Sequence, residues 1–138
     1  MKTRLALIAS LTLPLVACSG AAPEWTPLPS GADPPAACAR ADADGVIAIS
    51  ADQLRFSAPC MVAPAGVAFT VRFTNEESEA HNVAIYADSS AAVREFQGEG
   101  FSGPGVTRDY AVEALPAGEY FFRCDIHPPE MNGALYVR

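Results

Sequence analysis

The stretch Val67-Ala-Phe-Thr-Val-Arg-Phe-Thr74 alternates strictly between two kinds of side chain. One set consists of Val67, Phe69, Val71 and Phe73, and the set between them consists of Ala68, Thr70, Arg72 and Thr74. A period of two predicts a β-strand with one face buried and the other in solvent.

Similar β-prone runs occur on both sides of this stretch, at residues 45–50, 81–86, 106–112, 119–124 and 133–137. Turn signals separate them, including the acidic segment 75–79 and the segment 115–118. Residues 88–105 are polar and glycine-rich, and we expect an irregular excursion with a short helical turn at 90–96. Many short, regularly punctuated strands predict an all-β sandwich or barrel for residues 38–138.

The N-terminal segment reads as an export signal. A short basic start precedes an apolar run, residues 5–16, that is too short to span a bilayer. The run ends in Leu15-Val16-Ala17-Cys18, which resembles a bacterial lipobox. We therefore expect a signal peptide at 1–17 and lipidation at Cys18, and an ordinary signal peptide is the alternative. The proline- and alanine-rich residues 18–37 show no apolar periodicity and predict an extended tether.

The charge balance excludes some partners. The formal net charge is −7, and removal of Lys2 and Arg4 with residues 1–17 brings it to about −9. Such a surface disfavours nucleic acid, which needs basic contacts. Binding to an anionic membrane through charge is equally disfavoured, so we expect membrane attachment through the lipid alone. An acidic surface instead favours protein partners with basic docking patches.

Three soft or borderline metal donors lie close together near the C-terminus: Cys124, His127 and Met131. The other histidine of the chain, His81, opens an apolar run far upstream. One thiolate, two imidazoles and a weak thioether form the donor set that selects one copper ion for electron transfer. The nearby Glu130 is an alternative to Met131 and would give a harder site.

The four cysteines can be assigned together. If Cys18 carries lipid and Cys124 binds the metal, Cys38 and Cys60 remain, and outside the cytoplasm two spare thiols are normally oxidised to each other. Two alternatives stay open: Cys38 and Cys60 as buried free thiols, or a disulfide between Cys124 and one of them. The second alternative would abolish the metal site.

Residues 44–138 resemble the cupredoxin, or type 1 blue copper, family. The similar segments are Ala63–Gly66, His81–Tyr86, Gly103–Gly105, Leu115–Phe122, Cys124–Pro128 and Met131–Gly133. The resemblance implies a Greek-key sandwich of about seven to eight strands. It also implies that His81, Cys124 and His127 are near-planar ligands and Met131 a long axial one. Asn82 is implied in the surrounding shell, with its backbone near the Cys124 sulfur.

These features predict an exported electron carrier and not an enzyme, because the chain has no third histidine for a substrate-binding copper. We expect a monomer, held in the bacterial cell envelope on the periplasmic or cell-surface side, that exchanges single electrons with redox proteins. A copper storage or delivery protein is the alternative, and a structural sandwich without metal is a third. Methionine- and histidine-rich tracts that mark copper carriers are absent from the sequence.

Overall fold

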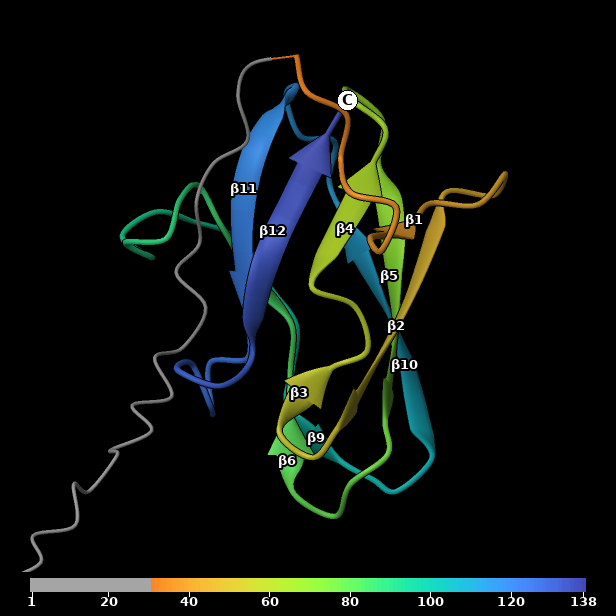
Figure 1. Cartoon of the computed structure of the whole chain (residues 1–138). Helices are drawn as coiled ribbons and strands as arrows, with labels where there is room; N and C mark the ends of the chain where they lie inside the picture. Colours follow the sequence, from red (N-terminus) through yellow and green to blue (C-terminus); the bar gives the residue numbers. More distant parts are fainter. Residues whose placement is uncertain (1–30) are drawn as a thin grey trace, which may run out of the picture.

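The computed structural model describes residues 31–138, which form an all-β sandwich (Figure 1). The predicted signal peptide and Cys18 lie outside the described residues, as does most of the predicted tether. Eight strands have three or more residues, as expected: β2 (Val46–Asp52), β4 (Cys60–Ala63), β5 (Phe69–Asn75), β7 (Ala84–Tyr86), β8 (Arg94–Gln97), β10 (Val106–Val112), β11 (Gly118–Arg123) and β12 (Asn132–Val137). Four strands have two residues: β1 (Ala39–Arg40), β3 (Arg55–Phe56), β6 (Ala80–His81) and β9 (Phe101–Ser102).

The strands form two main sheets and a small third one. The six-stranded sheet has the order β1-β4-β12-β11-β7-β8, and the four-stranded sheet has the order β10-β5-β2-β3. The third sheet pairs β6 with β9 at the end of the sandwich away from the C-terminus (Figure 1). The first described residues, drawn in orange, lie at the same end as the C-terminus.

The alternating stretch lies in the middle of the four-stranded sheet. Strand β5 pairs with β10 on one side and with β2 on the other, and it buries Phe69, Val71 and Phe73. The strand begins at Phe69, two residues later than the alternation predicts. Gly66 has a φ of +68° in the preceding turn, and Val67 is 55% exposed.

The core fills the space between the two main sheets. Phe56 connects them, since its ring centroid lies 6.1 Å from that of Phe73 and 5.1 Å from that of Phe122. Cys124 and Met131 belong to the same apolar cluster. Two of the four candidate metal donors are therefore part of the sandwich core.

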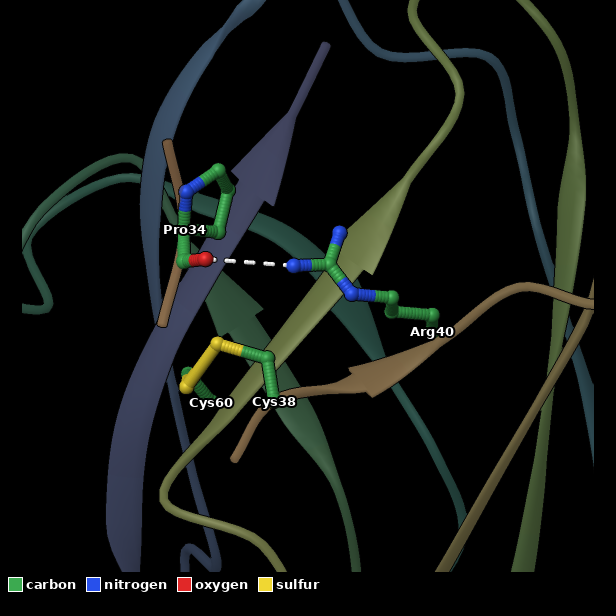
Figure 2. The surroundings of a disulfide bond; sticks show 4 residues. All are labelled: Pro34, Cys38, Arg40 and Cys60. Carbon is green, nitrogen blue, oxygen red and sulfur yellow. Dashed lines mark hydrogen bonds between the residues drawn. A yellow bond between two sulfur atoms is a disulfide. The ribbon is translucent and has the colours of Figure 1, made fainter. Parts of the chain in front are cut away.

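The predicted Cys38–Cys60 disulfide is formed (Figure 2). It joins the residue before β1 to the first residue of β4, with the two Cα atoms 4.5 Å apart. Beside it, the Arg40 guanidinium donates a hydrogen bond to the Pro34 carbonyl oxygen at 3.1 Å.

The helical turn expected at 90–96 is wrong. Residues 94–97 form β8, which pairs with β7 next to an irregularity between Ile85 and Tyr86. Strand β8 completes the edge of the six-stranded sheet. Its pairing with β7 outweighs the weak local preference for a turn.

Candidate metal centre

The donors come from strand β6 and from the β11–β12 connection, at one end of the sandwich. His81 ends β6 and lies opposite Phe101 of β9. Cys124 follows β11, His127 lies in the β11–β12 connection, and Met131 directly precedes β12. One short connection thus supplies three donors, and the small third sheet supplies the fourth.

The histidine and cysteine donor atoms form a triangle. Nδ1 of His81 lies 3.2 Å from Nδ1 of His127, and Sγ of Cys124 lies 3.8 Å and 4.0 Å from these two nitrogens. With bonds of about 2.05 Å to nitrogen and about 2.3 Å to sulfur, a trigonal metal ion needs sides of about 3.5 Å and 3.8 Å. The triangle therefore fits one first-row transition metal ion.

Met131 is placed beside this triangle by the backbone. Its carbonyl oxygen accepts a hydrogen bond from Cys124 N at 2.9 Å, and its N–H donates to the His127 carbonyl oxygen at 3.0 Å. Its side chain is fully buried, whereas Glu130 is exposed. This arrangement favours Met131 over Glu130 as the fourth donor.

The side chain of Asn82 links the segment after β6 to the β11–β12 connection. Its Oδ1 accepts a hydrogen bond from Asp125 N at 2.8 Å, and its Nδ2 donates to the Gly98 carbonyl oxygen at 3.1 Å. Asn82 is buried and lies next to His81, while Asp125 lies next to Cys124. The approach of its backbone to the Cys124 sulfur stays a prediction.

The state of the cysteines suits metal binding. Cys124 is a buried free thiol, so the structure excludes the alternative in which it forms a disulfide.

The protonation of His81 also suits metal binding. Burial lowers the pKa of His81, although the nearby Glu77 carboxylate opposes this effect. A neutral imidazole retains the ring lone pair that a metal ion needs.

Two acidic residues beside the histidines were not found by sequence reasoning. Glu77 Oε1 lies 3.3 Å from Nε2 of His81, and Glu79 Oε2 lies 3.5 Å from Nε2 of His127. In the sequence they belong to an acidic turn whose geometry no residue spacing defines. No sequence signal was available for these contacts.

A buried cysteine and two imidazoles at trigonal distances, with a buried thioether residue following them, are the donor set of a mononuclear type 1 copper site. This site lies at the end of a β-sandwich. The chain belongs to the cupredoxin-like domain family, whose model matches residues 12–137.

Solved structures agree with this fold. Auracyanin from the photosynthetic bacterium Roseiflexus castenholzii is 20% identical, with a TM-score of 0.61 over 70% of this chain and 99% of that one. Auracyanin A, a "blue" copper protein from Chloroflexus aurantiacus, is 21% identical, with a TM-score of 0.60 over 67% of this chain and 98% of that one. An amicyanin variant in its Cu(I) state is 25% identical, with a TM-score of 0.52 over 70% of this chain and 85% of that one. No curated protein matches the chain in sequence.

Proposed function

We propose that the protein is an extracytoplasmic blue copper protein that carries single electrons between redox partners, and that it is not an enzyme. The observation that carries the proposal is the buried donor triangle of His81, Cys124 and His127. When bound there, copper supplies a centre that alternates between two oxidation states. The similarity to an amicyanin solved with Cu(I) supports this assignment.

The surrounding residues favour electron transfer over release of the ion. His81, Cys124 and Met131 are fully buried, whereas the His127 side chain is 23% exposed. His127 is thus the one proposed ligand whose edge reaches solvent, and we assign electron entry and exit to it. Since strand ends and a hydrogen-bonded connection hold the donors, these side chains would move little when a bound copper ion changes its oxidation state.

The proposed location rests on separate observations. The signal-like residues 1–17, the candidate lipid site Cys18 and the Cys38–Cys60 disulfide support an exported, lipid-anchored protein in a bacterial cell envelope. The metal end lies opposite the first described residues, so an N-terminal tether would leave it facing away from the membrane. Redox proteins with basic patches fit the acidic surface. No helix within residues 31–138 is long and apolar enough to cross a membrane.

Copper loading of the purified protein tests the function. We expect an intensely blue protein that is bleached by a mild reductant, keeps its copper and turns blue again on reoxidation. Cys124→Ser should remove the colour, because the thiolate is lost. A colourless loaded protein would contradict the proposal, and loss of copper on reduction would favour copper delivery.

A further inference from the structure

The acidic turn before β6 places a carboxylate at the outer nitrogen of each histidine. Both contacts have similar lengths, 3.3 Å for Glu77 and His81 and 3.5 Å for Glu79 and His127. Their surroundings differ, because the Glu77 side chain is 19% exposed and the Glu79 side chain is 63% exposed. The chain therefore contains two matched contacts, one shielded from solvent and one open to it.

The contact shielded from solvent involves a histidine nitrogen that otherwise lacks a hydrogen-bond partner among the described residues. Nε2 of His81 is fully buried and has no partner at ideal hydrogen-bond geometry among the described residues. Glu77 Oε1 lies 3.3 Å from it. Burial of an N–H without a partner is unfavourable, so a small rotation that completes this hydrogen bond is favoured.

Glu77 is held by the main chain of two other segments and by the side chain of Asn75. Its Oε1 accepts a hydrogen bond from Leu54 N at 2.8 Å, in the turn between β2 and β3. Its own N–H donates to Asn75 Oδ1 at 2.9 Å, and its carbonyl oxygen accepts from Gly103 N at 2.8 Å. The fully buried Asn75 in turn donates to the carbonyl oxygens of Glu79 and Phe101. The carboxylate is consequently fixed in place.

We propose that Glu77 is a positioning residue that holds the proton of His81 on Nε2 and lowers the reduction potential of the metal centre. This inference rests on the proposed copper function. A proton on Nε2 leaves the lone pair on Nδ1, the nitrogen that faces Cys124 Sγ and His127. A carboxylate acceptor makes the imidazole a stronger donor and favours the more highly charged Cu(II) over Cu(I).

Glu79 supplies the matched control. Its contact with His127 is open to water, where an ion pair changes an equilibrium by no more than about fivefold and is screened by salt. Glu79→Gln and Glu77→Gln remove the same charge two residues apart. Glutamine also retains a side-chain oxygen that accepts the hydrogen bond from Leu54 N, so the turn is expected to keep its structure.

The reduction potentials of the three copper-loaded proteins test the proposal. Glu77→Gln should weaken Cu(II) relative to Cu(I) by tenfold or more, as changes around metal-binding histidines typically do. Tenfold corresponds to a rise of about 59 mV for one electron. Glu79→Gln should change the ratio by less than about fivefold, and only at low salt. An unchanged potential in Glu77→Gln, or equal shifts in both variants, would overturn the proposal.

A copper-independent measurement separates this inference from the proposed function. In the metal-free wild-type protein, ¹⁵N NMR of the imidazole should show His81 protonated on Nε2. Protonation on Nδ1 would overturn the role of Glu77 whether or not copper binds. A metal-free result as expected, together with a colourless loaded protein, would leave the Glu77 contact intact and refute the copper function alone.

Discussion

Asn82 shows how a single side chain joins the two parts of the metal centre. Its side-chain amide accepts a hydrogen bond from Asp125 N in the β11–β12 connection and donates one to the Gly98 carbonyl oxygen in the β8–β9 connection. Asn82→Ala leaves these groups without partners, and we expect a loss of about 1–3 kcal/mol in the free energy of unfolding. Denaturant titration of the metal-free protein measures it.

Asn132→Ala is the control for this change. The Asn132 amide donates to the carbonyl oxygens of Pro128 and Pro129, but in a more exposed position. We therefore expect a smaller loss. Equal losses in both variants would show that burial of the Asn82 amide does not increase its contribution to the free energy of unfolding.

Tyr110 makes the free energy of unfolding depend on pH in the alkaline range. Burial raises its pKa to about 12, and its hydroxyl donates to the Glu99 carbonyl oxygen at 2.6 Å. The unfolded phenol ionises near pH 10, so between about pH 10 and 12 the folded state binds more protons than the unfolded state. The contribution of the protonated Tyr110 to the free energy of unfolding is complete below about pH 10 and is lost as the pH rises through about 12.

We expect this loss to be absent in Tyr110→Phe, which has no ionisable group at this position. Urea titrations below pH 10 and between about pH 10 and 12 compare the two proteins. Identical alkaline slopes for the wild type and Tyr110→Phe would assign the loss to other groups.

Among the elements, the strands with a regular pattern were the predictable ones. The predicted strand 106–112 has the same bounds as β10. The predicted strand 119–124 is shifted by one residue relative to β11, and the predicted strand 133–137 begins one residue later than β12. The sequence pattern that predicts each of these strands lies within the strand itself. The pairing order and the parallel pairs β2–β5 and β4–β12 depend on contacts distant in sequence. No local pattern encodes them.

The run 81–86 illustrates the limit. We predict one strand here, with His81 and Asn82 leading into the apolar residues 83–86, but β6 and β7 belong to different sheets. All six of its residues are buried, so no change in hydrophobicity marks the break. Donor chemistry was nevertheless enough to select His81, because a second imidazole completes the copper donor set of the Cys-x-x-His sequence and Met131. The Glu77 contact requires turn geometry, which donor chemistry does not report.

Gly103 controls how the acidic turn packs against the third sheet. An added Cβ would overlap the carbonyl oxygen of Asn75 and lie 2.6 Å from that of Glu77. Gly103→Ala must push the turn away, and we expect a loss of about 1–3 kcal/mol in the free energy of unfolding. The reduction potential should also rise, because Glu77 moves with the turn.

Thermal unfolding and voltammetry of the loaded protein measure these two effects. Ser102→Ala, on the exposed neighbouring residue of β9, is the control and should change neither quantity appreciably. A destabilised Gly103→Ala protein with an unchanged potential would separate the turn from the tuning of the metal.

At the scale of the whole molecule, the disulfide and the metal donors lie on opposite faces of the six-stranded sheet. Along β12, Ala134 and Tyr136 pack with Cys38 and Cys60 in an outer cluster. Leu135 and Val137 point to the core cluster that contains Cys124 and Met131. The sheet therefore separates the covalent cross-link from the redox chemistry.

This separation predicts that stability and colour respond independently to loss of the disulfide. The cross-link spans 22 residues, and a loop of this size stabilises by about 3 kcal/mol in the chain-entropy model. We expect Cys38→Ser/Cys60→Ser to unfold at a lower temperature, by on the order of 10–20 °C for a domain of this size. The blue absorption and reduction potential should remain, since the donor triangle is on the other face.

Arg40→Ala is the control, because it removes the hydrogen bond to Pro34 beside the cross-link and leaves the disulfide intact (Figure 2). As an exposed change it should cost no more than about 0.5 kcal/mol. Loss of colour in the double serine variant, with the fold retained in circular dichroism, would show that the cysteines are wrongly assigned. Retained colour with a lowered unfolding temperature would establish the disulfide as a support of the sandwich that does not contribute to the metal centre.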